Sequence, residues 1–371
     1  MLLAFNLRVA NSQIPPVLTD LPLGDAGSAL LVTIPAICFS LAAFSGPALR
    51  ARFGEERALF VLVATLLAGT ALRPFGGVWS LVAGTVVCGL AVAVMNVMMP
   101  SIVRRRFPRH IGEMTAAYTV SLSIGAGLAA SLTIPLARAL GGSVAWGLAV
   151  WAIPPAVALM LWLPQLRWSR SMQPVGGVAL KLLKSRLAWQ LTLYFGLQSM
   201  VWYTFLSWLP AIYRERGTDA ATAGALLGVL TAFGIVGNIA APLAASRLRD
   251  QRLVVLVASL LTMGAIAGIL AAPPQSTVIW VLLLAVGTSG SFSLSLFLMA
   301  SRHRDAARLS SMAQGLGYLI AAGGPPLAGF LHTASRGWTV PLVVTIGISV
   351  FQLVAGLLAA RAPIEASVES L

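Results

Sequence analysis

Long apolar stretches alternate with short polar connections along the whole chain. Each stretch has about 18 to 27 residues, enough for an α-helix to cross about 30 Å of hydrocarbon. The pattern therefore predicts an all-α membrane protein with twelve transmembrane helices. The stretches cover residues 1–18, 27–49, 57–74, 78–103, 112–136, 144–163, 187–213, 220–245, 253–272, 278–300, 309–331 and 338–360.

The longest polar stretch, residues 165–186, lies between the sixth and the seventh apolar stretches. It carries five basic residues together with proline and glycine, a composition typical of a connection. We therefore expect an N-terminal six-helix bundle over 1–164, a cytoplasmic linker over 165–186, and a C-terminal six-helix bundle with a short tail over 187–371.

An internal repeat supports this division. The three residues Pro47, Arg52 and Arg57 recur 195 positions later as Pro242, Arg247 and Arg252. Duplicated bundles are common among membrane proteins that move solutes, so the repeat favours two related halves.

The charged residues are few, and the basic ones are distributed unevenly between the two sides of the predicted membrane. Only 10% of the 371 residues are charged, against about 25% in a soluble domain, which argues against a soluble protein. Twelve spans of about 20 residues leave about ten residues for each connection, so there is no room for a soluble catalytic domain. The net charge is +14, but the basic residues gather in short groups between apolar stretches, which argues against a nucleic-acid partner. Nineteen Lys and Arg residues fall on one side and five on the other, which predicts that both termini are cytoplasmic.

The chain lacks the residue patterns of intramembrane enzymes. No HExxH pattern, paired intramembrane carboxylates or phosphate loop occurs, and none of the eleven acidic residues falls near a predicted midplane. Cys38 and Cys88 lie within apolar stretches without the spacing of a metal or redox centre. We expect no catalytic activity, no metal and no cofactor.

Arg8 is the one full charge that we place inside a predicted span and away from its ends. Burying arginine at a helix centre costs about 2.5 to 3.5 kcal/mol, so such a residue is a candidate for function. Its guanidinium offers a planar fork for a carboxylate, a nitro group or a small inorganic anion. Asn11 follows one turn later on the same face. Alternatively, Arg8 extends to the cytoplasmic interface, because only seven residues precede it.

Other polar groups at mid-span depth are candidates to line a pocket. Gln198 with Trp202, and Gln314 with Tyr318, are four residues apart and share a helix face. An amide beside an aromatic ring suits a small, planar, polar solute. Each of these side chains could equally hydrogen-bond a neighbouring helix. Tyr118 and Tyr203 are further candidates of this kind.

Two sets of motifs resemble known transporters. The run from Gly46 to Arg57 resembles the Gly-x-x-x-Asp-Arg-x-Gly-Arg-Lys signature of the major facilitator superfamily, with Arg50 where the aspartate would stand. The run from Ala4 to Arg8 resembles the Ala-Leu-Asn-Leu-Arg start of the cyanate and 2-nitroimidazole transporter family. Further segments that resemble this family are 95–100, 104–108, 195–199, 207–210 and 247–252.

The resemblance implies a secondary transporter in the inner membrane of a bacterium, with two pseudo-symmetric six-helix bundles that work by alternating access. The solute would be a small anion or a compact polar organic molecule, and a single chain would suffice. The implied substrate-binding residues are Arg8, Asn11, Tyr118, Gln198, Tyr203, Gln314 and Tyr318. The implied cytoplasmic gating residues are Arg50, Arg52, Arg57, Arg247 and Arg252. Two alternatives stay open: export of neutral or cationic drugs, and a multi-span sensor that transports nothing.

Overall fold

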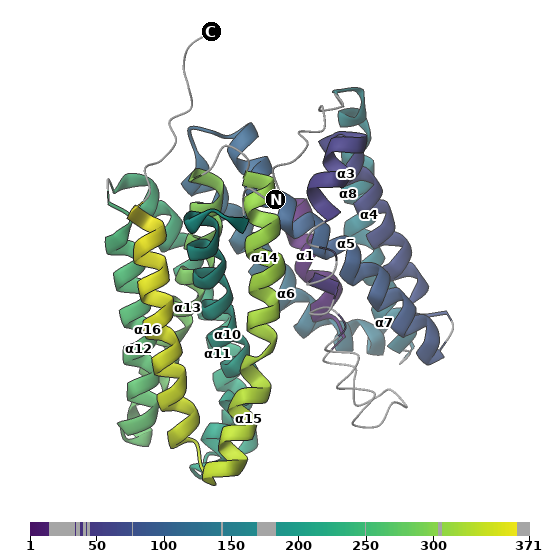
Figure 1. Cartoon of the computed structure of the whole chain (residues 1–371). Helices are drawn as coiled ribbons and strands as arrows, with labels where there is room; N and C mark the ends of the chain where they lie inside the picture. Colours follow the sequence, from purple (N-terminus) through teal and green to yellow (C-terminus); the bar gives the residue numbers. More distant parts are fainter. Residues whose placement is uncertain are drawn as a thin grey trace. The chain divides into compact units, whose positions relative to one another are not determined.

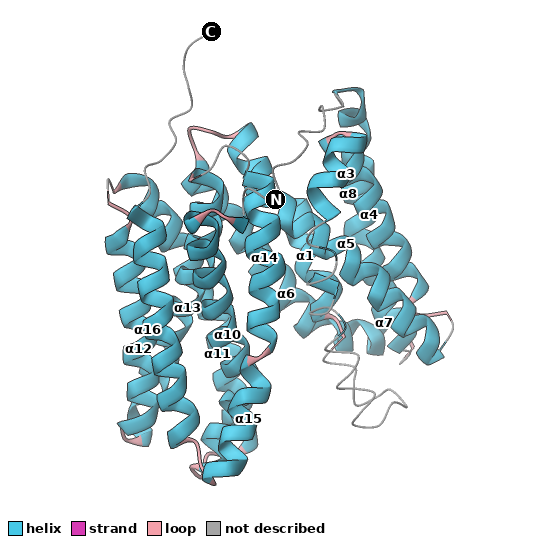
Figure 2. Ribbon diagram, viewed as in Figure 1, coloured by secondary structure: helices cyan, strands magenta, loops and turns pink. Residues whose placement is uncertain are grey.

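A computed structural model describes most of the chain, and the described part is helical without a strand (Figure 2). The described residues are 1–14, 34, 38, 39, 42, 45–75, 77–141, 144–168, 183–248, 250–302 and 306–361. The chain forms two compact units, one of Met1–Met99 with Ser121–Ala179 and the other of Pro100–Val120 with Leu180–Leu371. The predicted second stretch, 27–49, lies mostly outside the described residues.

The first unit contains the N-terminal helices. Gly54, with φ of 79°, makes the turn between α3 and α4, a backbone conformation that suits glycine. Two carboxylates, Glu55 and Glu56, open α4, where the positive end of the helix dipole favours them. The helices here are α1 (Leu2–Ser12), α3 (Gly46–Phe53), α4 (Glu55–Leu72), most of α5 (Gly77–Arg106) and of α6 (Ile111–Ala139), α7 (Val144–Ala149) and α8 (Ile153–Trp162), with 3-10 turns η3 (Val150–Ala152) and η4 (Leu163–Trp168).

The second unit contains the C-terminal helices (Figure 1). They are α10 (Arg186–Glu215), α11 (Ala220–Arg247), α12 (Arg252–Ala271), α13 (Thr277–Ser301), α14 (Ala306–Ala322), α15 (Gly324–Ser335) and α16 (Thr339–Arg361), with a 3-10 turn η5 (Pro274–Ser276). In the close packing of this unit, α11 lies against α13, α10 against α14 and α12 against α16.

The predicted stretch 309–331 divides into two helices at Gly323. Pro325 and Pro326 follow the break, and neither can donate a backbone hydrogen bond to continue α14. The indole Nε1 of Trp208 donates to the carbonyl oxygen of Pro325 at 2.9 Å, which ties the break to α10.

The segment Pro100–Val120 packs with the C-terminal helices. Arg104 Nη1 donates to the Ala300 carbonyl at 2.9 Å, and Thr119 Oγ1 donates to the Asn238 carbonyl at 3.3 Å. A Cβ at Gly112 would lie 2.6 Å from the carbonyl oxygen of Pro242, so the absence of a side chain permits this approach. The division into 1–164 and 187–371 stays a prediction.

The outer surfaces of the helices suit a bilayer. Within the described residues, seven helices are long and apolar enough to cross a membrane. On α12 the side chains of Leu253, Val257 and Leu260 recur at helical spacing and are 54%, 48% and 51% exposed. An apolar stripe of this kind would be unfavourable in water and is favourable in lipid.

Candidate functional site

Arg8 lies on α1 between residues that pack tightly. Its neighbours Leu7 and Val9 are 1% and 2% exposed, whereas Arg8 itself is half-buried. Arg8 therefore lies away from the most densely packed side of α1. The side chain of Asn11, its predicted companion, lies outside the described residues.

The amino-terminal half of α1 is fixed by two neighbours in its own unit. The Asn6 side-chain amide is buried and donates to the carbonyls of Leu2 at 2.9 Å and Pro154 at 3.3 Å. On another side, a Cβ at Gly125 would lie 2.5 Å from the carbonyl oxygen of Phe5. Helix α6 therefore passes against the backbone of α1.

The carboxyl end of α1 is held by Arg73, which follows α4. Arg73 is only 2% exposed, and its Nη1 donates to the Ala10 carbonyl at 2.7 Å. With the Gln13 amide oriented to satisfy both of its ends, Gln13 Oε1 accepts from Arg73 Nη1 at 2.6 Å and Gln13 Nε2 donates to the Leu148 carbonyl at 3.3 Å. Arg73 is the residue directly after α4, and the carbonyls at the negative end of α1 attract its charge there.

Two glycines bring α10 and α14 into direct contact. A Cβ at Gly317 would lie 2.6 Å from Phe195 Cδ1 and 3.3 Å from the backbone nitrogen of Gly196. The ring of Tyr318 meets the ring of Phe195 edge-on, with centroids 5.1 Å apart. The contact places Gln198, Gln314 and Tyr318 in one packed core.

Both predicted glutamines are buried in this core. Gln198 Nε2 donates to Ser199 Oγ at 2.7 Å, and Gln314 Nε2 donates to Ser310 Oγ at 2.6 Å. In the described part of the chain, Gln198 Oε1 has no hydrogen-bond partner. An unpartnered buried acceptor is unfavourable and is a position where a donor of a bound solute could be accommodated.

Tyr118 and Tyr318 are both buried within the second unit. Tyr118 is 3% exposed and its hydroxyl has no hydrogen-bond partner among the described residues, and Tyr318 is 4% exposed. Tyr203 is half-buried on α10, and no hydrogen bond or ring contact in the described part joins it to the others. Four of the predicted residues thus lie in this unit's core, and Tyr203 stands apart from them.

The predicted cytoplasmic arginines lie near helix ends. Arg52 stands 5.4 Å from the Phe53 ring centroid, Arg57 opens α4, Arg247 ends α11, and Arg50 is half-buried in α3. The Arg252 Nε lies 3.8 Å from Asp250 Oδ1.

Arg302 was not singled out from the sequence. Its Nη2 donates to Gln251 Oε1 and to the Ala360 carbonyl, the latter at 3.0 Å. Burial lowers the pKa of the Arg302 guanidinium, and Asp250 acts in the opposite direction. In the sequence, the only indication of these contacts was the position of Arg302 directly after a long apolar stretch.

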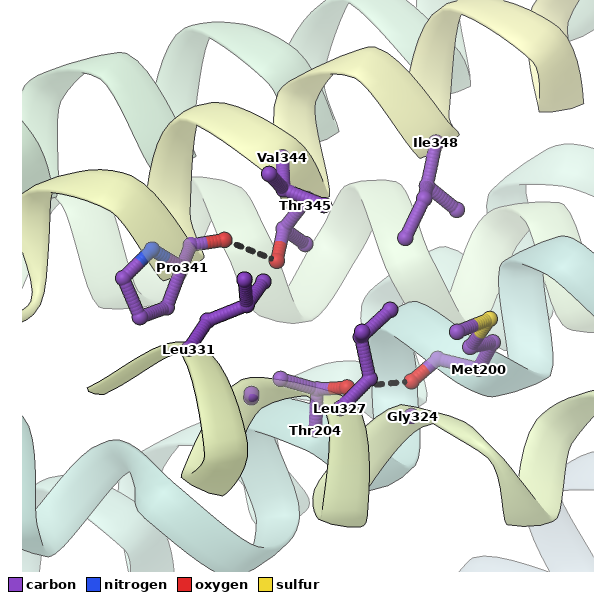
Figure 3. Close-up of a pocket in the computed structure, with 10 residues that line it drawn as sticks. Met200, Thr204, Gly324, Leu327, Leu331, Pro341, Val344, Thr345 and Ile348 are labelled. Carbon is purple, nitrogen blue, oxygen red and sulfur yellow. Dashed lines mark hydrogen bonds between the residues drawn. The ribbon is translucent and has the colours of Figure 1, made fainter. Parts of the chain in front are cut away.

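A groove between α10, α15 and α16 holds none of the predicted residues (Figure 3). Its two hydroxyl groups, on Thr204 and Thr345, donate to the carbonyls of Met200 and Pro341 in their own helices at 2.8 and 2.7 Å. The rest of the lining is apolar, so the groove offers little to a polar solute. Nor do three His, Cys, Asp or Glu side chains of the described residues come together as a metal-binding group.

Residues 1–323 match the sequence model of the Major Facilitator Superfamily. The chain belongs to this superfamily. It is accordingly a multi-pass membrane transporter and not an enzyme, and twelve helices are consistent with the superfamily fold. The resemblance drawn from the motifs is confirmed by curated relatives within it.

Two of these relatives come from Escherichia coli (strain K12). The 2-nitroimidazole transporter is 35% identical over 374 residues, which cover 97% of this chain and 94% of that protein. The cyanate transport protein CynX is 27% identical over 368 residues, which cover 95% of each. Among solved structures, the E. coli fucose:proton symporter FucP covers 97% of this chain and 98% of its own, with a TM-score of 0.79 and 13% identity, and shows the superfamily fold.

Proposed function

We propose that this protein carries a small anion or a compact, planar polar solute across the inner membrane of a bacterium by alternating access. Arg8 is the electrostatic anchor of the solute. The observation that carries the proposal is the position of Arg8, a half-buried cation on a helix whose backbone is held on both sides of it. A guanidinium on a helix held in this way can bind a carboxylate or a nitro group through its planar fork, or pair with the charge of cyanate.

The solutes for which two relatives are named support this class of solute. One is a 2-nitroimidazole transporter and another transports cyanate. Both solutes are small and polar: cyanate is a linear anion, and 2-nitroimidazole is a planar ring that carries a nitro group. The proposal assigns this chain a solute of the same chemical class.

The remaining pocket residues would contact the polar edge and the face of such a solute. The buried Tyr118 hydroxyl and Gln198 Oε1 supply one donor and one acceptor that no other described group uses. Gln314 and Tyr318 belong to the same core, and Asn11 and Tyr203 complete the proposed set. The gating arginines would act at the cytoplasmic ends of the helices, with both termini in the cytoplasm and a single chain as the working unit.

Ligand-induced thermal stabilisation tests the proposal. The purified protein is titrated with cyanate, nitrate, benzoate and 2-nitroimidazole, beside Arg8→Ala and a control, Arg138→Ala. Arg138 is an exposed arginine in the last turn of α6. A ligand at a hundred times its Kd adds about 2.7 kcal/mol to the apparent stability.

We expect stabilisation of the native chain and of Arg138→Ala, and its loss in Arg8→Ala. Equal stabilisation of all three proteins would remove Arg8 from the site. A hydrophobic cation, tetraphenylphosphonium, is titrated in the same way, and stabilisation by this cation alone would favour drug export instead. With no stabilisation and no flux of any compound, the sensor alternative would stand.

A further inference from the structure

Two arginines cap the ends of helices in the same manner, one in each unit. Arg73 follows the last residue of α4 and donates to the Ala10 carbonyl near the end of α1 at 2.7 Å. Arg216 follows the last residue of α10 and donates to the carbonyls of Ile269 and Leu270 near the end of α12. In the predicted repeat, α1 and α10 open their halves, while α4 and α12 are the third spans. The two caps therefore join equivalent pairs of helices. In the first unit the arginine after the third span bonds the first span, and in the second unit the arginine after the first span bonds the third.

The two arginines differ in burial. Arg216 is exposed to solvent, whereas Arg73 is 2% exposed. The Nε and Nη2 groups of Arg73 have no hydrogen-bond partner in the part of the chain that the structure describes. A buried guanidinium with unused donors is costly to the overall stability of the protein, and an apolar side chain of similar size would avoid this cost. Overall stability therefore does not explain why an arginine occupies position 73.

With the bonds of Arg73, α1 is held by neighbouring residues both before and after Arg8. Before Arg8, Asn6 donates to Pro154 at 3.3 Å and the Phe5 carbonyl lies against Gly125. After Arg8, Arg73 holds Ala10 and also Gln13. Loss of the Arg73 bonds would leave only the amino-terminal side of α1 held by these contacts.

We propose that Arg73 is a positioning residue for the solute: its bonds to Ala10 and Gln13 hold the carboxyl end of α1, and this sets the direction of the Arg8 side chain. The inference rests on the proposed role of Arg8. Arg73 itself acts through α1 and makes no contact with the solute.

Hydrogen exchange tests, without any ligand, whether Arg73 holds the carboxyl end of α1. Arg73→Met removes the cap on α1, and the control Arg216→Met removes the matching cap on α12. We expect the amides of residues 2–14 to exchange about tenfold faster in Arg73→Met and at the native rate in Arg216→Met. Unchanged exchange over 2–14 in Arg73→Met overturns the inference, whatever happens to solute binding. If Arg73→Met does not fold, Gln13→Met breaks the same connection and is expected to raise exchange less.

Measurements of solute affinity test whether this support of α1 affects solute binding. Apparent Kd values for cyanate and for 2-nitroimidazole are measured by thermal-shift titration. We expect about tenfold weaker binding in Arg73→Met, partial rescue in Arg73→Lys, whose ammonium keeps one donor for Ala10, and a change of less than twofold in Arg216→Met. Equal losses in the Arg73→Met and Arg216→Met proteins would indicate a general structural effect and overturn the inference.

A double variant separates this inference from the proposed function. If Arg73 acts through Arg8, adding Arg73→Met to Arg8→Ala weakens binding no further. Native affinity in Arg8→Ala contradicts the proposed function. Lost affinity in Arg8→Ala together with native affinity in Arg73→Met contradicts only the positioning role.

Discussion

The ring of Tyr318 meets the ring of Phe195 edge-on, with centroids 5.1 Å apart and ring planes at 85°. Such an edge-to-face pair is favourable beyond the area it buries. The pair lies where Gly196 and Gly317 bring α10 and α14 together. It therefore fixes a proposed pocket residue on one helix against the core of another.

Substitution Gly317→Ala tests this packing. The new Cβ would lie 2.6 Å from Phe195 Cδ1, so the Phe195 ring or α14 must shift. We expect a loss of about 1 to 3 kcal/mol of stability, the usual cost of overpacking, measured as a lower Tm in detergent. In the control Gly264→Ala the new Cβ on α12 meets no atom within 4 Å, and its Tm should stay the same or rise slightly. A similar fall in both variants would contradict the account of the α10–α14 contact.

The substitution Tyr118→Phe separates binding from stability. The Tyr118 hydroxyl is buried without a hydrogen-bond partner in the described part of the chain, so its removal should leave Tm unchanged or raise it. If the hydroxyl contacts the solute, the apparent Kd for cyanate or 2-nitroimidazole should rise about tenfold, the value of one lost hydrogen bond of about 1.4 kcal/mol. A lower Tm with an unchanged Kd would assign Tyr118 a structural role only.

The positions of the carboxylates predict how transport responds to a pH gradient. The described acidic residues lie at or beside helix ends. Glu55 and Glu56 open α4, Glu113 lies in the first turn of α6, Glu215 ends α10, and Asp219 and Asp250 lie just before α11 and α12. No carboxylate among them is placed to carry a proton through the middle of a span. We expect counterflow of 2-nitroimidazole in proteoliposomes to change less than twofold when a pH gradient is imposed. A strong dependence would point to a proton-carrying group outside the described residues or to a different mechanism.

Much of the fold could be predicted because lipid imposes a simple pattern. A helix in lipid must be long and apolar, so α10, α13 and α16 begin and end within a few residues of their predicted stretches. The break at Gly323 also follows from nearby residues, because Pro325 and Pro326 interrupt helical hydrogen bonding. These features depend on nearby residues only.

The rest depends on contacts between residues far apart in the sequence. Arg73 ends an apolar stretch, which is ordinary for an interfacial arginine, and only the Ala10 carbonyl 63 positions earlier explains its burial. The packing of Pro100–Val120 with the C-terminal helices likewise depends on partners such as Asn238 and Ala300. Periodicity and composition hold no information about such partners. For the site, the sequence indicated Tyr318, and the structure adds its edge-on contact with Phe195 on α10.

Solute exchange by Arg8 variants is the most direct test of the central claim. Counterflow of radiolabelled cyanate and 2-nitroimidazole is measured in proteoliposomes that contain equal amounts of the native protein, Arg8→Ala, Arg8→Lys or Arg138→Ala. The account predicts exchange of at least one of the two solutes by the native protein and Arg138→Ala, at least a tenfold loss in Arg8→Ala, and a smaller loss in Arg8→Lys, which keeps the charge without the planar fork. Exchange by correctly folded Arg8→Ala at the native rate would contradict it.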